Sequence, residues 1–293
     1  MKPKLKKQLS TIIKIAVSVG LIWLVFKKLD WEQLRQLLKT AGYGYLAAAV
    51  FFFLLSQLIS VLRFDVFIRK IGIRMSFSKN IQLYMLGMFY NFFIPGGVGG
   101  DAYKVVLLNK SHRKSVKKIG QIVFIERFTG IVAIGLLFSV FIFFIPTPFN
   151  IYWNYAVGIT GIIATILILR LIIKFLRANK KRIHIVFIYS LLVQICQLIC
   201  MICILKSFGV EDNYKIYLVL FLISSVLSVI SFAGVGIREA VFYFGAEWYN
   251  FNADVSAGAA IIFSVLTALT SFFGIIYLFY NIDLKNKSQV KTK

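Results

Sequence analysis

Six charged side chains stand in or beside strongly apolar stretches of this sequence. Glu126 and Arg127 interrupt the apolar run 119–144. If a helix starts near Ile119, both charges lie about 10 Å into it, because an α-helix rises 1.5 Å per residue. At that depth in a membrane, a charge costs several kcal/mol unless it is paired or hydrated. These residue types can bind a charged group or a proton. The six residues are Asp101, Lys104, Glu126, Arg127, Arg238 and Glu239.

Two glycine-rich interruptions hold the remaining charges of this set. The first extends from Asn91 to Lys104, and the second covers residues 231–240. In a bilayer, proline and glycine open a helix only where protein or a water-filled cavity satisfies the released backbone groups. Paired interruptions in the two halves of a chain indicate a transport site. The alternative is close helix packing through glycine, with a chance similarity between the halves. The breaking residues are Pro95, Gly96, Gly97, Gly99, Gly100, Gly234 and Gly236.

The embedded charges must find partners on other elements. Adjacent residues of a helix diverge by about 100°, so Glu126 and Arg127 cannot be each other's best partner. The expected pairs are Asp101 with Arg127 or Arg238, and Glu126 and Glu239 with Lys104 or a second base. In one interpretation, these ions only hold the bundle together.

In the other interpretation, the same residues bind a lipid head group. The planar guanidinium group matches a phosphate, which favours Arg127 and Arg238 for this role. Lys104 and the free N–H groups near Gly97, Gly99 and Gly236 assist them. The acids Asp101, Glu126 and Glu239 then bind an ammonium group or a proton, and Asn91 opens the first interruption.

The composition indicates an all-α polytopic membrane protein. Hydrophobic residues make up 59% of the 293 residues, charged residues make up 15%, and the mean hydropathy is +0.83. Residues 1–293 therefore form a single membrane domain with short loops. Six apolar runs are long enough to cross a hydrocarbon layer of about 30 Å. They are Leu9–Phe26, Tyr43–Leu62, Ile119–Phe144, Ile151–Ile173, Ile183–Leu205 and Val255–Tyr280.

The net charge of +23 reports membrane topology, because Lys and Arg gather in short clusters beside the apolar runs, and no nucleic-acid partner is expected. If the two interrupted segments enter and leave on the same side, 25 Lys and Arg residues lie on the cytoplasmic side and seven lie outside. Cytoplasmic loops carry the excess of positive charge, so this arrangement is favoured over eight full crossings. It groups loops 63–79, 104–118 and 170–182 with both termini in the cytoplasm, including the basic tail 285–293.

This topology contains an inverted repeat. Residues 1–145 and 146–284 each supply two spans, one re-entrant hairpin and a third span, in opposite orientations. The hairpins are Phe77–Lys104 and Tyr214–Asn250, and their glycine tips are expected to meet near the midplane. Such repeats give many secondary transporters two alternative openings to one site.

The motifs resemble those of the flippase-like membrane proteins related to the transmembrane domain of lysylphosphatidylglycerol synthase, the multiple peptide resistance factor. The resemblance covers nearly the whole chain. It rests on Asn91 with Pro95-Gly-Gly-Val-Gly-Gly-Asp101 and Lys104, on Glu126-Arg127 with Gly130, and on Gly234-Val-Gly-Ile-Arg-Glu239. The second motif departs from the family pattern, because Val229 and Ala233 stand where a proline and a double glycine are usual.

The resemblance implies movement of a charged-head-group phospholipid or a polyprenyl-linked lipid across a bacterial cytoplasmic membrane. The implied partners are membrane phospholipids, anionic or aminoacylated, with a homo-oligomer and a separate lipid-modifying enzyme as further options. In the best-known relatives a soluble domain transfers the amino acid, so no synthase activity is expected of residues 1–293. The alternative function is a secondary transporter of a small polar solute or ion with the same repeats.

An integral-membrane enzyme is the poorest of the three classes. Cys196, Cys200 and Cys203 follow helical spacing inside an apolar run, where cysteine commonly packs as a small buried residue. His112 and His184 stand in basic surroundings without further ligands, so no metal site is expected. The sequence lacks a Walker-type phosphate loop, and no cofactor is expected.

Overall fold

The computed structural model of the chain describes residues 31–93, 98–146, 151–176, 180–228 and 236–279. Within these residues the fold is entirely helical, as the sequence predicts, and no strand occurs. The elements are α2 (Trp31–Thr40), α3 (Tyr43–Lys70), α4 (Phe77–Phe93), α5 (Gly99–His112), α6 (Val116–Phe141) with the 3-10 turn η2 (Ile142–Phe144), α7 (Ile151–Leu176), α8 (Lys180–Ser207), α9 (Tyr214–Leu227), α10 (Ile237–Trp248), α11 (Ala253–Phe273) and α12 (Ile276–Phe279).

Five helical segments are long and apolar enough to cross a membrane. They correspond to five of the six predicted runs, and the sixth, Leu9–Phe26, lies outside the described residues. The final segment continues from α11 through a turn at Gly274 into α12. The five segments are Tyr43–Lys70, Val116–Phe144, Ile151–Leu176, Lys181–Ser207 and Ala253–Leu278.

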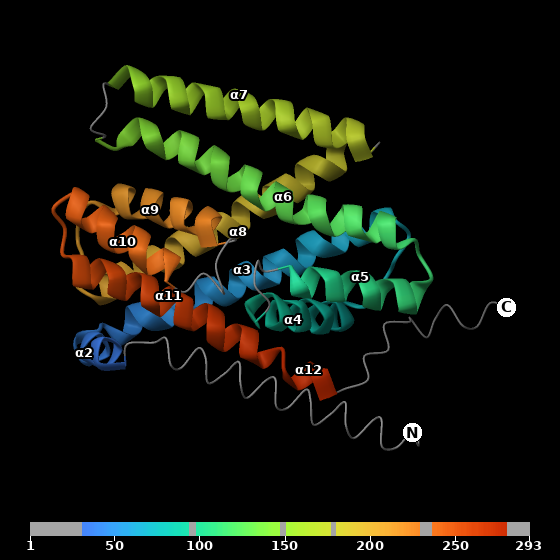
Figure 1. The fold of residues 1–293 in the computed structure, drawn as a ribbon, viewed down its shortest axis with the longest axis horizontal. Coiled ribbons are helices and arrows are strands. Elements are labelled where there is room, and N and C mark those ends of the chain that lie inside the picture. Colours follow the sequence, from blue (N-terminus) through green and yellow to red (C-terminus); the bar gives the residue numbers. More distant parts are fainter. Residues whose placement is uncertain (1–30, 94–97, 147–150, 177–179, 229–235, 280–293) are drawn as a thin grey trace.

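The two interrupted segments form helix pairs, α4 with α5 and α9 with α10. Each helix is short: the 14 residues of α5 extend about 21 Å at 1.5 Å per residue, less than the hydrocarbon layer. In Figure 1, α4 runs toward the centre of the bundle and α5 returns to the same end, while α9 and α10 do so from the opposite end. The tips of both pairs, residues 94–97 and 229–235, lie outside the described residues.

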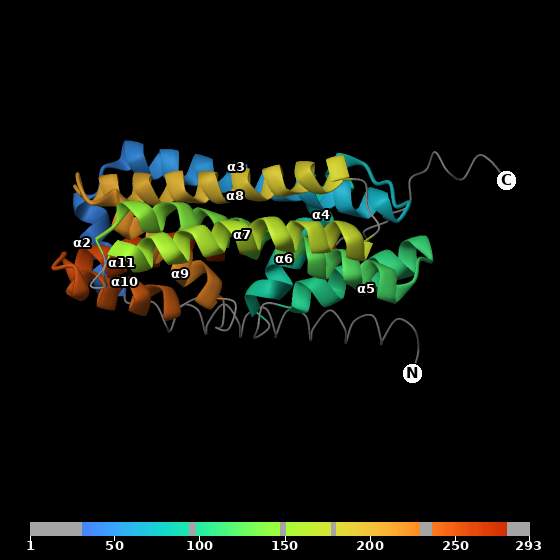
Figure 2. The same ribbon diagram turned by 90° about the horizontal axis from the view of Figure 1, so that it is seen from above.

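The long helices α3 and α8 form an antiparallel pair along one face of the bundle, at the top of Figure 2. At one end, the Gly42 N–H donates to the Ser207 carbonyl at 2.8 Å. At the other end, the Lys70 ammonium donates to the Leu176 carbonyl. The broken helix pair of each half packs against a long helix of the other half: α4 of the first half contacts α11 of the second, and α9 of the second half contacts α6 of the first.

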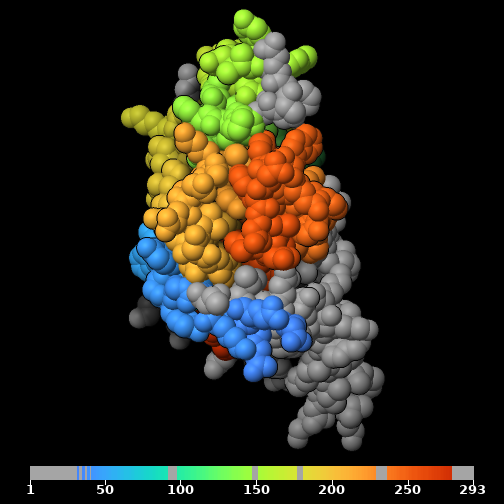
Figure 3. Space-filling model, turned by 90° about the vertical axis from the view of Figure 1, so that its left-hand side faces the viewer, coloured from blue at the N-terminus to red at the C-terminus, as the bar shows by residue number. Residues whose placement is uncertain are grey.

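The connections 71–76 and 113–115 and the end of α7 lie together at one end of the bundle, whereas both termini of the predicted grouping lie outside the described residues. The Lys70 contact joins the end of α3 to the end of α7, and Lys114 Nζ lies 3.5 Å from the position of a Cβ on Gly72. The opposite end, seen in Figure 3, gathers α2, the start of α3 and the connections beside α9, α10 and α11. There the Tyr249 hydroxyl donates to the Pro146 carbonyl at 3.0 Å.

The structure corrects two of the predicted loop boundaries. Residues 63–70 belong to α3 and residues 104–112 belong to α5. Arg63 and Lys104, which the topology analysis placed among the loop charges, are 8% and 3% exposed. Both cations have partners inside the bundle, so their charge marks neither the end of a span nor a loop.

Candidate functional site

A cluster of three charged side chains follows the first interruption, between α5 and α6. Asp101 stands in the first turn of α5, and one of its carboxylate oxygens lies 3.0 Å from Arg127 Nη1 on α6. Its other oxygen lies 3.6 Å from Lys104 Nζ, one turn further along α5. One carboxylate therefore serves two cations, and the cluster is formally positive. Asp101 with Arg127 is one of the two pairings expected from the sequence.

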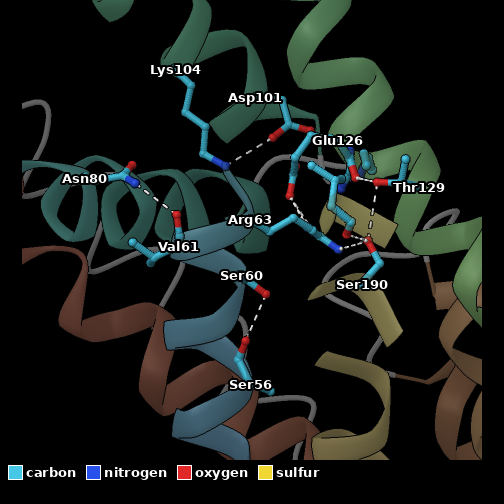
Figure 4. Close-up of polar contacts among 12 residues, drawn as sticks. Ser56, Ser60, Val61, Arg63, Asn80, Asp101, Lys104, Glu126, Thr129 and Ser190 are labelled. Carbon is cyan, nitrogen blue, oxygen red and sulfur yellow. Dashed lines mark hydrogen bonds and ion pairs between the residues drawn. The ribbon is translucent and has the colours of Figure 1, made fainter. Parts of the chain in front are cut away.

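Lys104 is the buried member of this cluster. Its ammonium lies 4.6 Å from the centre of the Tyr84 ring and 5.0 Å from the centre of the Phe64 ring. Cation–π attraction of this kind stabilises a charge that has lost its water. The side chain crosses α4 at Gly87, where a Cβ would come within 2.4 Å of Lys104 Cε. Figure 4 shows Lys104 extending from α5 toward α4, with its ammonium directed at Asp101.

The start of α5 is held by a side chain from α4. Asn91 Oδ1 accepts a hydrogen bond of 2.8 Å from the Gly100 N–H, which belongs to the unpaired first turn of the helix. Gly100 is required here, because a Cβ would lie 1.8 Å from the Gly87 carbonyl oxygen. The asparagine and the glycine therefore fix the interruption and set Asp101 at the positive end of the α5 dipole.

A second charged pair connects α3, α6 and α8 and is fully internal. Arg63 Nε donates to Glu126 Oε1 at 2.8 Å, and Arg63 Nη2 donates to the same oxygen. Arg63 Nη1 donates to the Ser190 hydroxyl at 3.1 Å, and that hydroxyl lies 3.4 Å from the Thr129 hydroxyl. Gly130 lies beside the guanidinium, and a Cβ there would lie 3.4 Å from Nη1, at ordinary contact distance. Figure 4 shows these groups converging from three helices.

Arg63 is the buried charge that the sequence analysis missed. It follows Leu62 directly, and the first charge after an apolar run resembles the end of a span. The sequence also contains a signal that the span continues past Arg63. Four of the next five residues, Phe64 to Ile68, are hydrophobic. Glu126 is paired with Arg63, the second base of the two expected alternatives, whereas Lys104 contacts Asp101.

The second interruption has its own polar contacts on α10 and α11. Glu239 Oε2 accepts from the Gly236 N–H at 2.5 Å, and Glu239 Oε1 accepts from the Ser264 hydroxyl at 2.8 Å. Ser264 in turn accepts from Arg238 Nη1 at 3.2 Å. Gly236 has φ +91°. This backbone conformation is strained for any residue with a side chain, but glycine adopts it readily. Glu239 therefore caps its own helix.

Arg238 is buried at this second site. Its guanidinium carbon lies 4.8 Å from the centre of the Phe263 ring, and its Nε is buried without a hydrogen-bond partner among the described residues. The contacts described for Arg238 lead to α11, whereas Asp101 is bound to Arg127, so the alternative pairing of Asp101 with Arg238 is not the one adopted.

The predicted site residues thus form two separate groups in the described structure. One group contains Asp101, Lys104 and Arg127, with Glu126 beside it, and the other contains Arg238 and Glu239. Among the breaking residues, Gly99, Gly100 and Gly236 are described, whereas Pro95, Gly96, Gly97 and Gly234 lie outside the described residues.

The cysteines take the packing role that their spacing predicts. Cys200 is fully buried in the core shared by α3, α8, α9 and α11, and Cys196 and Cys203 are also free thiols on α8. In the part of the chain that the structure describes, no group of three or more His, Cys, Asp or Glu side chains could hold a metal ion.

Long apolar helices around a charged interior define a multi-pass helical membrane protein. The chain belongs to the family of the lysylphosphatidylglycerol synthase TM region, which matches residues 11–276. This membership confirms the resemblance drawn from the motifs and is consistent with a membrane function related to lipids. The chain is also similar to a UPF0104 membrane protein of Pyrococcus horikoshii, with 26% identity over 170 residues, or 56% of this chain and 49% of that protein. The match therefore spans about half the length of that relative.

Proposed function

We propose that this protein moves phospholipids or polyprenyl-linked lipids with charged head groups between the leaflets of the cytoplasmic membrane. The observation that carries the proposal is the Asp101–Arg127 pair at the start of a broken helix. The Arg127 side chain is 31% exposed and the Asp101 side chain 17% exposed, whereas the side chains of Arg63 and Glu126 are 9% and 6% exposed. The first pair is therefore the more accessible one, and the second holds the helices together.

The charges of the Asp101–Lys104–Arg127 cluster suit a lipid phosphate. Two cations share one carboxylate, so an incoming phosphate competes with Asp101 for the Arg127 guanidinium. Charge-assisted hydrogen bonds from arginine to phosphate are strong and often bidentate. The carboxylate that this exchange releases is then able to bind an ammonium group on an aminoacylated head group. The dipole of α5 adds to the attraction for the anion.

The position of Arg127 suits access from the side. Three residues along a helix correspond to an angular offset of about 60°, so Phe124 lies close to Arg127 around α6. Phe124 is 68% exposed in a candidate membrane span, which directs it toward lipid. Arg127 therefore lies between the lipid-facing surface of α6 and the charged interior. A head group at Arg127 leaves its chains in the bilayer, which avoids a cost of about 0.8 kcal/mol for each CH₂ withdrawn from the hydrocarbon.

The exchanged packing of the halves supports a transport cycle. α4 packs on α11 as α9 packs on α6, and the two broken pairs approach from opposite ends. We interpret residues 1–145 and 146–284 as inverted repeats, with both pairs re-entrant and both termini cytoplasmic. Rocking of one repeat against the other then opens the cluster to each leaflet in turn.

The test measures head-group movement in vesicles that contain the purified protein. The vesicles carry phosphatidylglycerol, its lysyl derivative or a polyprenyl phosphate, each with a head group that a membrane-impermeant reagent modifies. We expect the inner-leaflet fraction to become reactive with the native protein, but not with the double variant Asp101→Asn, Arg127→Ala. The matched control is Asp65→Asn, Arg69→Ala, which removes an ion pair at the end of α3.

One result would show that the variant pair is not specific, and another would decide against the proposal. Loss of transport in the control as well as in the double variant would show that charge removal in general damages the protein. No head-group movement with any of the three lipids, together with uptake of a small polar solute, would establish a secondary solute transporter instead.

A further inference from the structure

A long apolar groove lies between α6 and α7, the outermost helix pair in Figure 1. It consists of two cavities of about 590 Å³ and about 540 Å³. Phe128 of α6 and Ile168 of α7 line both cavities, so the two meet at these side chains. We call the combined feature the α6–α7 groove. Its α6 wall extends from Gly120 in one cavity to Ser139 in the other.

The α6–α7 groove is as long as the hydrocarbon layer is thick. From Gly120 to Ser139 the α6 axis rises about 28 Å, against about 30 Å for the hydrocarbon core. Both helices are candidate membrane spans. The side chains that line the groove are mainly apolar, including Phe124, Phe138 and Phe175. An occupant must therefore be apolar and elongated.

Arg127 borders this groove close to its middle. Around the α6 axis, Arg127 lies about 20° from Gly120, seven residues before it, and about 40° from Ile131, four residues after it. Gly120 lines one cavity and Ile131 lines the other. Along the axis, Arg127 immediately precedes Phe128, which lines both cavities. Arg127 is not among the residues that line either cavity, and its guanidinium contacts Asp101 on α5, so it borders the groove through its position on α6.

We propose that the α6–α7 groove binds one acyl chain of the phospholipid whose phosphate is held at Arg127. This inference rests on the proposed function. The proposed function describes how the head group crosses the membrane, and the inference describes where one acyl chain lies during that crossing. A phosphate and its acyl chains are joined through a short glycerol unit, so the cation must lie beside the apolar groove, as Arg127 does. Because the groove continues on both sides of Arg127, the chain changes from one half to the other past Phe128 and Ile168 while the head group crosses.

Two glycines allow the groove to be filled without disturbing the fold. A Cβ on Gly120 or on Gly135 would have no heavy atom within 4 Å, and these residues line different cavities. Gly120→Leu and Gly135→Leu therefore each occupy one half of the groove. Gly44 on α3 is equally open and lies elsewhere, so Gly44→Leu is the matched control. All three changes add the same side chain to a helix.

The experiment uses the full chain in phosphatidylglycerol vesicles that contain a trace of phosphatidylglycerol with a photoreactive diazirine in one acyl chain. After illumination, labelled peptides are identified by mass spectrometry. We expect labels concentrated on residues 120–139 and 153–175. Leucine excludes roughly two methylene groups of the chain, so we expect about a tenfold loss of label in the filled half, and no loss in the Gly44→Leu protein.

Equal labelling of all lipid-facing helices, or labelling of the groove that neither leucine reduces, would overturn the acyl-chain assignment. So would the finding that a helix of another chain, captured by cross-linking, occupies the groove. The head-group assay separates this inference from the proposed function. Groove labelling without head-group movement would leave a lipid-binding groove in a protein that is not a flippase. Head-group movement without groove labelling would place the tail elsewhere.

Discussion

The buried pair Arg63–Glu126 allows a quantitative test of what holds the bundle together. Arg63→Met leaves the Glu126 carboxylate, 5% exposed, without its guanidinium, and the hydroxyls of Ser190 and Thr129 cannot replace that charge. Breaking one side of a buried ion pair costs about 3–5 kcal/mol. The double variant Arg63→Met, Glu126→Met removes both charges and keeps similar volumes, so it should recover most of that loss.

The assay is reversible unfolding in mixed micelles, followed by helix content, for the native protein, both single variants and the double variant. The expected interaction energy between the two positions is a large fraction of the single-variant loss, about 2–3 kcal/mol or more, because the residues share a network. Single variants that lose less than about 1 kcal/mol would mean that the pair behaves as a hydrated surface pair, and the reasoning from burial would be refuted. Head-group movement by the double variant would assign Glu126 to structure, whereas its loss in a stable double variant would assign Glu126 to the transport site.

Three further predictions follow from individual contacts. Arg127→Lys keeps the charge but loses the planar fork, so head-group movement should fall much more than unfolding stability, and unchanged movement would assign Arg127 to structure. Gly100→Ala places a Cβ 1.8 Å from the Gly87 carbonyl oxygen, so it should lower unfolding stability by about 1–3 kcal/mol, and a neutral result would show that α4 and α5 separate easily. In a background without native cysteines, Arg113→Cys should react with an impermeant thiol reagent only from the cytoplasm and Asn250→Cys only from outside. The same side for both would contradict the inverted repeat.

The spans were predictable because length and apolar composition determine them almost alone. An interior charge was predictable as a charge, and its partner only as a set of alternatives. Asp101 was expected to meet Arg127 or Arg238, because all three stand where an isolated charge is costly, and the packing of α5 against α6 selects Arg127. Arg63 could not be distinguished from a loop charge, since a cation after an apolar run has the same pattern at a membrane surface as inside a bundle until its partner is known.

The uncharged parts of the site were hidden for a different reason. Asn91 binds the Gly100 N–H across the interruption, which depends on how α4 and α5 approach each other. Ser190 and Ser264 are unremarkable serines in apolar helices until the helices pack, when one meets Arg63 and the other joins Arg238 to Glu239. Sequence patterns report the periodicity of a single element, whereas these contacts arise between elements.

The two interruptions carry unequal chemistry on similar packing, and this difference bears on how transport proceeds. At the first interruption, one carboxylate is shared by two cations, and Arg127 remains partly exposed beside the α6–α7 groove. At the second, Glu239 is engaged by its own helix end and by Ser264, and Arg238 is buried against Phe263. An exchange of partners with a phosphate is easier where a carboxylate already divides its interaction between two cations. Under the proposed function, the first interruption is therefore the better candidate for the head-group site, and the second is the candidate for the element against which the first repeat moves.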